Sequence, residues 1–188
     1  FAGGRLWANA SVAQGLDLLG ANQPGDPLSS RSDADGTFTT AIFSASWARD
    51  LIAGFGVRLA VRSQIASQAL LLSEEIGLGG ATFGRGYDYS ERSGDQGTMA
   101  YGELTYGWDQ KLGPIDGLEV YAFADGGEVT NFGRGFGSGS LFSSGGGLRA
   151  DVDRRTDAAV EVAVPLSGPR YDSDSEDPRI RFSVTRHF

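Results

Sequence analysis

The sequence predicts an all-β protein, and specifically a transmembrane antiparallel β-barrel, on three observations. Apolar and polar residues alternate along most of the chain, which is the pattern of strands with two different faces. Long and short connections alternate between these segments, as they do in outer-membrane barrels. The last residue, Phe188, is an aromatic that ends the last alternating segment. A soluble β-sandwich also alternates and remains the alternative on pattern alone.

Eight segments alternate in this way, the first two least clearly. Their expected ranges are about 5–16, 36–49, 55–68, 97–109, 117–127, 140–152, 155–166 and 178–188. The long connections are 17–35, 69–96, 128–139 and 167–177, and the short ones lie near 50–54, 110–116 and 153–154. Long loops of such barrels lie outside the cell and short turns face the periplasm. We therefore expect the last strand to end in the periplasm, where Trp47, Trp108 and Phe188 form part of an aromatic girdle.

The two faces of each expected strand follow from its alternation. The first segment, 5–16, alternates too weakly to assign its faces. The outward, apolar face holds Ala41, Phe43, Ala45, Trp47, Val57, Leu59, Val61, Leu104, Tyr106, Trp108, Leu118, Val120, Phe142, Leu148, Val160, Val162, Ile180, Phe182 and Val184. The inward face holds Arg58, Arg62, Gln64, Glu103, Phe123, Asp125, Ser143, Arg149, Asp151 and Glu161. On parity, Arg58, Arg62, Gln64, Arg149 and Asp151 are candidates to line a pore.

Composition excludes several classes of protein. The 188 residues include 29 Gly, 11 Phe, 6 Tyr and 3 Trp but no Cys, which rules out a disulfide framework or a cysteine-based zinc site. The formal net charge of −8 does not favour nucleic acid as a partner. No apolar run approaches the roughly 18 residues of a membrane helix. Because the first residue is Phe1, we expect the chain to be a piece of a longer precursor, without its signal peptide.

The connection expected at about 69–96 carries the most specific motifs. Residues 70–104 contain, in order, Leu70–Leu72, Ser73-Glu74, Gly79-Gly80, Arg85-Gly86-Tyr87, Ser93-Gly94-Asp95-x-Gly97 and Glu103-Leu104. Residues 121–127 read YAFADGG, with Phe123, Asp125 and Gly127, and the chain ends in RFSVTRHF. Together they resemble the two-partner secretion transporters of the haemolysin secretion/activation (ShlB/FhaC/HecB) family. One departure is Gly84, where that family usually has Val.

This resemblance implies an architecture and a function. The full protein would be a sixteen-stranded barrel of the bacterial outer membrane, and residues 1–188 would supply its last eight strands. It would secrete one large unfolded exoprotein, without enzymatic activity, catalytic residues, metal or cofactor. Its partners would be the exoprotein, outer-membrane lipid and, during insertion, the barrel-assembly machinery. That machinery would recognise the last strand, with Phe182, Val184 and Phe188.

The resemblance also assigns roles to particular residues. The long loop would fold back into the lumen, where Arg85, in the Arg85-Gly86-Tyr87 motif, meets Glu103 and Asp125. Parity places both carboxylates on the inward face, and a guanidinium can bridge two carboxylates. We therefore expect Arg85 to hold the loop as a gate. Phe123, Gly127, Ser93, Gly94 and Asp95 would support this motif. Without the resemblance, Arg85 would be interpreted as an exposed loop arginine.

Three other functions stay open at this point. The first is the insertase branch of the same superfamily, which carries a similar loop motif and inserts other barrels. The second is an outer-membrane lipase, disfavoured because a Ser-His-Asp site would depend on His187, the only histidine, beside the end of the last strand. The third is a passive porin, disfavoured because porins lack the Arg-Gly-Tyr loop motif. The acidic stretch 172–177 lacks the spacing of a calcium loop and is expected to be a solvated loop.

Overall fold

Eight long strands form one antiparallel sheet in the computed structural model, which describes residues 1–108, 113, 115–133 and 135–188. Their order in the sheet is β1-β2-β3-β6-β7-β8-β9-β10, so neighbours along the chain are neighbours in the sheet. The strands are β1 Arg5–Gln14, β2 Thr39–Asp50, β3 Phe55–Ala66, β6 Gln96–Trp108, β7 Gly117–Thr130, β8 Gly139–Asp153, β9 Thr156–Pro165 and β10 Arg179–Arg186. The all-β antiparallel class predicted from the sequence is confirmed.

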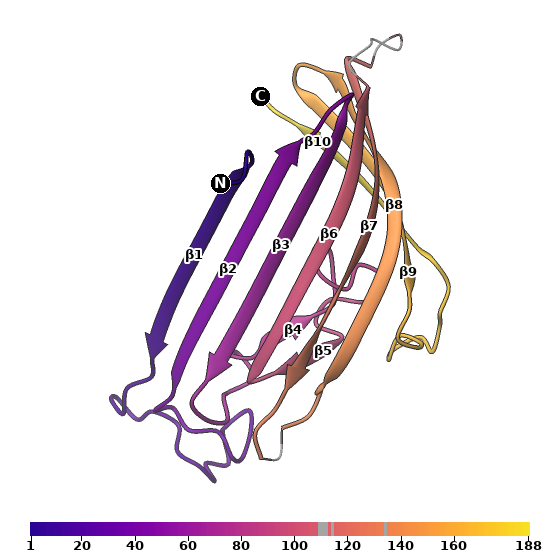
Figure 1. Ribbon diagram of the computed structural model, residues 1–188. Helices are drawn as coiled ribbons and strands as arrows, with labels where there is room; N and C mark the ends of the chain where they lie inside the picture. Colours follow the sequence, from indigo (N-terminus) through magenta and orange to yellow (C-terminus); the bar gives the residue numbers. More distant parts are fainter. Residues whose placement is uncertain (109–112, 114, 134) are drawn as a thin grey trace.

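The sheet is open in the described chain, with β1 at one edge and β10 at the other. Figure 1 shows it as a curved wall. Pairing is continuous from β1 to β9 except for one register shift, between Asp151 and Asp153 in β8. Both termini lie toward the end of the wall that carries the turn between β2 and β3 (Figure 1). Longer connections, including the one between β1 and β2, lie at the opposite end.

One face of the sheet is apolar and exposed, which is the reverse of a water-soluble sheet. Its exposed large side chains include Phe43, Leu59, Leu104, Trp108, Val120, Phe142, Ile180 and Phe182. The other face carries polar and charged side chains that are partly covered by protein, such as Gln64, Glu103, Asp125 and Ser143. The alternation seen in the sequence therefore divides the sheet into a bare apolar face and a covered polar face. No helix of the described residues is long and apolar enough to cross a membrane.

A small second sheet lies on the concave side of the wall (Figure 1). It pairs β4, Ile76–Leu78, with β5, Arg92–Gly94, in antiparallel fashion. Both strands belong to the connection between β3 and β6, residues 67–95, which we call the docked segment. The sequence predicts a loop without strands here, and the structure differs. Strands of three residues are too short to show a periodicity, so this hairpin left no pattern to read.

Several element boundaries also differ from the expectation. The first strand ends at Gln14 and not at residue 16, β2 begins at Thr39 and not at residue 36, and β7 continues to Thr130. The last strand ends at Arg186, so Phe188 lies two residues beyond it and does not end a strand. The boundary expected at residue 109 and most of the connection at 110–116 lie outside the described residues. None of these differences changes the order of the strands.

Candidate functional site

The docked segment is attached to the sheet by an apolar cluster. Ile76, Leu78 and Tyr87 of the segment pack against the sheet residues Met99, Val129 and Leu141, and all six are buried. Tyr87 and Leu78 are completely inaccessible to solvent. Burial of large apolar side chains stabilises contacts by roughly 1.5–3 kcal/mol per residue. The segment is therefore packed onto the concave face and brings the Arg85-Gly86-Tyr87 motif with it.

The guanidinium of Arg85 is buried among three carboxylates. Its Nη1 atom lies 3.2 Å from Oε2 of Glu103 on β6 and 3.0 Å from Oε2 of Glu161 on β9. Its Nε atom lies 3.3 Å from Oδ2 of Asp125 on β7, in a charge contact that is not a hydrogen bond. The side chains of Arg85, Glu103 and Asp125 are 6%, 1% and 0% exposed. A desolvated cation of this kind requires such partners.

Two aromatic rings complete the surroundings of Arg85. The guanidinium carbon lies 4.0 Å from the centre of the Phe123 ring and 4.9 Å from that of Tyr101. Cations over aromatic faces are attracted by the ring quadrupole. The backbone N–H of Arg85 also points to Asp125, with its nitrogen 3.2 Å from Oδ2. Arg85 is thus held through both its side chain and its backbone.

Gly86 and Tyr87 fix the position of the same tip. The N–H of Gly86 donates to Oγ of Ser143 on β8 at 3.1 Å. A Cβ atom at Gly86 would lie 2.8 Å from the nitrogen of Pro165 and 2.9 Å from the carbonyl carbon of Val164. Because both are backbone atoms of β9 that cannot move aside easily, only glycine lets the chain come this close. The hydroxyl of Tyr87 accepts a hydrogen bond from the Ser167 N–H at 2.7 Å.

A wider network of charges surrounds the three carboxylates. Arg149 lies 2.6 Å from Glu103 and 2.8 Å from Glu119, and Arg58 lies 3.2 Å and 2.7 Å from the same two residues. Arg181 on β10 lies 3.3 Å from Glu161. Among the described residues, this network joins four arginines (58, 85, 149 and 181) to four carboxylates (103, 119, 125 and 161). Its formal charge is balanced only while Arg85 is docked.

The supporting motif residues fall into two groups. Phe123 lies under the Arg85 guanidinium, and Gly127 packs against the β6 backbone, where a Cβ would be 2.5 Å from the Thr98 carbonyl oxygen. Ser93, Gly94 and Asp95 lie away from Arg85. The Ser93 hydroxyl donates to Oε2 of Glu75 at 2.7 Å. A Cβ at Gly94 would lie 2.6 Å from the carbonyl oxygen of Thr130.

Asp95 is the centre of a second buried cluster, which joins three long connections. Its carboxylate is completely buried and accepts from Nη1 of Arg31 at 2.8 Å, from the N–H of Leu70 at 2.7 Å and from the N–H of Phe132 at 2.7 Å. Burial alone would lower the pKa of the Arg31 guanidinium, but hydrogen bonds to Asp33 and Asp95 outweigh it and raise that pKa. Asp95 therefore fastens the loops together and takes no part in the contacts of Arg85.

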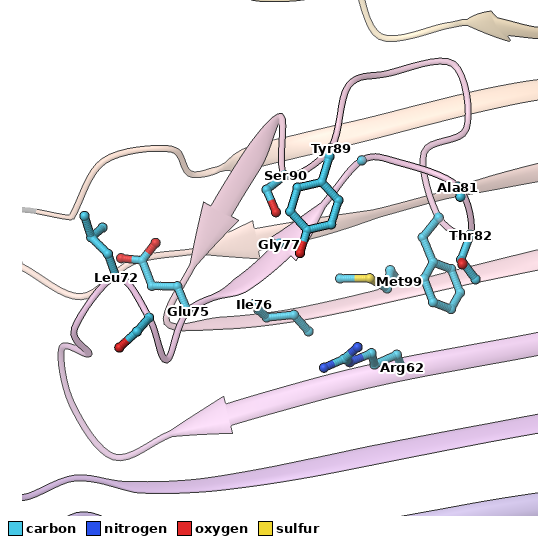
Figure 2. Close-up of a pocket in the computed structure, with 13 residues that line it drawn as sticks. Arg62, Leu72, Glu75, Ile76, Gly77, Ala81, Thr82, Tyr89, Ser90 and Met99 are labelled. Atoms are coloured by element: carbon cyan, nitrogen blue, oxygen red, sulfur yellow. The ribbon is translucent and has the colours of Figure 1, made fainter. Parts of the chain in front are cut away.

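A pocket of about 610 Å³ opens beside the docked segment. In Figure 2, Arg62 and Met99 lie on the sheet side, and Glu75, Tyr89 and Ser90 belong to the docked segment. A smaller pocket of about 320 Å³ lies at Arg85 itself, between Arg58, Arg149 and Glu161. Ala81 and Thr82 of the docked segment line both pockets. Among the described residues, no three His, Cys, Asp or Glu side chains are grouped so as to hold a metal ion.

The remaining predicted residues lie elsewhere. Phe182, Val184 and Phe188 are exposed on or just after the edge strand β10, which pairs with β9, the strand that carries Glu161. The alternation predicts Glu161 on the inward face but no role for it, and the sequence predicts no role for Arg31, Arg170 or Arg179. The sequence indicates which of these residues lie on a strand face and which lie in a loop, but no pattern in it connects them to Arg85 or Asp95.

Comparison with known proteins identifies the family. The family model described as haemolysin secretion/activation protein ShlB/FhaC/HecB matches residues 1–150. Because this is most of the chain, the chain belongs to the ShlB/FhaC/HecB family. This confirms the resemblance found in the sequence.

Two solved structures are similar to this chain. CdiB from Escherichia coli is similar with a TM-score of 0.79 and 22% identity, over 99% of this chain and 34% of that one. CdiB from Acinetobacter baumannii is similar with a TM-score of 0.60 and 25% identity, over 79% of this chain and 27% of that one. The likeness to the first shows a shared fold, and the chain spans only about a third of its length. No curated protein matches the sequence.

Proposed function

We propose that the parent of this chain is an outer-membrane transporter of two-partner secretion, which passes a large unfolded exoprotein through its pore. The sheet would form the last eight strands of a sixteen-stranded barrel, with its apolar face toward lipid and its concave face toward the lumen. Membership of the ShlB/FhaC/HecB family supports this function. The bare apolar face supports the orientation, because such a face costs free energy in water and not in lipid.

The observation that carries the proposal is the burial of Arg85 among Glu103, Asp125 and Glu161. These contacts place the docked segment across the face that would line the pore. We propose that the docked segment is a gate, closed in the arrangement described above. The pore needs no chemistry on its cargo, so the role of these residues is to set the balance between docked and released states.

The size of the interaction is sufficient for a gate. Removal of one partner from a buried ion pair costs about 3–5 kcal/mol, because the other charge is left without compensation. A change of that size shifts an equilibrium by a factor of ~100 or more. A segment that is mostly docked in the wild type would then be mostly released.

Single-channel recording from the full-length protein in planar bilayers tests this proposal. We expect Arg85→Ala to raise the mean conductance or its fluctuations. The matched control is Arg154→Ala, an exposed arginine in the turn between β8 and β9. If the wild type conducts nothing and both variants behave like it, the pore function is wrong, and the insertase branch becomes the better proposal.

A further inference from the structure

The tip of the docked segment, residues 85–88, contacts a second element besides the sheet. This element is the connection between β9 and β10, residues 166–178, which we call the strap. Gly86 shows the arrangement most simply. Its N–H donates to Ser143 of the sheet at 3.1 Å, and its carbonyl oxygen accepts from Nε of Arg170 in the strap at 2.9 Å. The two ends of one residue are therefore bonded to two different elements.

Arg170 is a buried cation whose described partners are backbone carbonyl groups. The residue is 9% exposed. Besides the carbonyl oxygen of Gly86, its guanidinium donates to those of Ser175 at 3.3 Å and Asp177 at 2.5 Å. Hydrogen bonds from a charged donor are stronger than neutral ones. The Arg170 side chain thus stabilises the fold of the strap itself and also bonds the strap to the tip.

Further contacts join the strap and the start of β10 to the tip. Nη1 of Arg179, the first residue of β10, lies 2.8 Å from Oδ1 of Asp88 and also donates to the carbonyl oxygen of Tyr87. The hydroxyl of Tyr87 donates to the carbonyl oxygen of Gly168 at 3.3 Å. Three residues beyond the tip, the carboxylate of Glu91 accepts from the N–H of Tyr171. The tip is therefore bonded on one side to sheet carboxylates and on the other to the strap.

We propose that Arg170 and Arg179 are positioning residues that keep the tip docked, and that the strap must open before the tip can leave the sheet. Release of Arg85 from Glu103 and Asp125 moves Gly86 and Tyr87 as well, and these two cannot move while Arg170 and Arg179 hold their carbonyl groups. The geometry stands by itself, but its meaning for secretion depends on the gate function proposed above. The strap would then be a second control point on the gate.

Hydrogen exchange at the backbone amides of Arg85 and Gly86 tests the inference in the full-length protein. Both amides donate to side chains of the sheet, Asp125 and Ser143, so their exchange requires the tip to leave it. We expect Arg170→Ala and Arg179→Ala to accelerate exchange at both amides about 10- to 100-fold, the effect of losing charged hydrogen bonds. Arg154→Ala, at the other end of the sheet, should leave it at the wild-type rate.

The amides in the middle of the β6–β7 pair report whether a variant still folds. They should stay protected in every variant. If these amides lose protection in Arg170→Ala, that variant is misfolded, and the test then depends on Arg179→Ala. Arg179 is partly exposed, so its removal disturbs the packing of the fold less. Wild-type exchange at Arg85 and Gly86 in a folded strap variant would overturn the inference.

Conductance of the same variants separates this inference from the proposed function. If exchange is faster in the strap variants but conductance does not respond even to Arg85→Ala, the strap does hold the tip and the docked segment is not a gate. If conductance responds to Arg85→Ala but exchange is at the wild-type rate in both strap variants, the docked segment is a gate and the strap does not hold it.

Discussion

Arg85 and Arg62 lie on the same side of the sheet and differ in what surrounds them. Arg62 is exposed beside the larger pocket (Figure 2), whereas Arg85 is buried among three carboxylates and two aromatic rings. A buried ion pair adds little net stability relative to apolar residues of the same shape, but it penalises every arrangement in which one charge is left alone. We infer that the Arg85 contacts determine where the tip docks more than they determine overall stability.

Gly86 gives a prediction at the same scale. Gly86→Ala places a methyl group within 3 Å of backbone atoms of Val164 and Pro165, so the tip cannot seat without a shift of β9. Overpacking of this kind costs typically ~1–3 kcal/mol. We expect the mean conductance of the variant to rise toward that of Arg85→Ala. Gly107→Ala is the matched control, because among the described residues, its two chain neighbours aside, the atom nearest to the added methyl is the Gly54 carbonyl oxygen at 3.8 Å. Identical channels from both glycine variants would contradict the account.

The docked segment is an element whose stability comes from packing and not from strand pairing. Its hairpin pairs only three residues of β4 with three of β5, and an isolated two-stranded hairpin is marginal at best. The buried cluster of Ile76, Leu78 and Tyr87 against the sheet supplies what pairing cannot. Loss of packing should therefore release the whole segment.

Leu78→Ala tests that expectation. Truncation of a buried leucine costs about 2–5 kcal/mol, and here the cost falls on the docked state. We expect the amides of β4 and β5 to exchange faster while those of β6 and β7 stay protected. Leu104→Ala removes the same atoms from the exposed apolar face, where the side chain is 62% exposed. The packing account fails if the two leucine variants have the same effect on β4 and β5.

Sequence alternation located most of the eight long strands, because these strands have one face that differs in polarity from the other, whereas β1 alternates only weakly. It also placed Glu103 and Asp125 on the covered face, since both fall on the parity opposite to Leu104 and Val120. It could not find β4 and β5, which are too short to alternate. Several strand ends, such as those at Gln14, Thr39 and Thr130, differ from the predicted ranges because alternation fades gradually into the loops.

The contacts of the site were harder to predict than its strands. Arg85 and Asp95 were singled out only through a resemblance in motif, and Arg170 and Arg31 were not singled out at all. Arg170 lies 84 residues from Gly86 along the chain, and Arg31 lies 64 residues from Asp95. Such pairs are set by how long connections fold over the sheet, and loops carry no periodic pattern that would reveal it.

At the scale of the whole molecule, the long connections are joined to one another at one end of the sheet, whereas the apolar face and both edges are uncovered. The end with the long connections is consolidated, since Asp95 joins the connections that contain Arg31, Leu70 and Phe132. The apolar face is bare and the two edge strands, β1 and β10, have no further partner within the described chain. An edge strand exposes unpaired backbone groups, which are costly in lipid. In the proposed sixteen-stranded barrel, further strands would pair with these edges.

The central claim is that the tip must leave Asp125 for the pore to open. The 188 residues contain no cysteine, so Arg85→Cys with Asp125→Cys gives this part of the protein one thiol pair, at two positions where the backbone nitrogen of Arg85 now lies 3.2 Å from the Asp125 carboxylate. A disulfide, or a short bis-thiol reagent, should join them and keep the conductance of the full-length protein low, and cleavage or reduction should raise it reversibly. A cross-link that forms without changing conductance, or thiols that never join, would contradict the account.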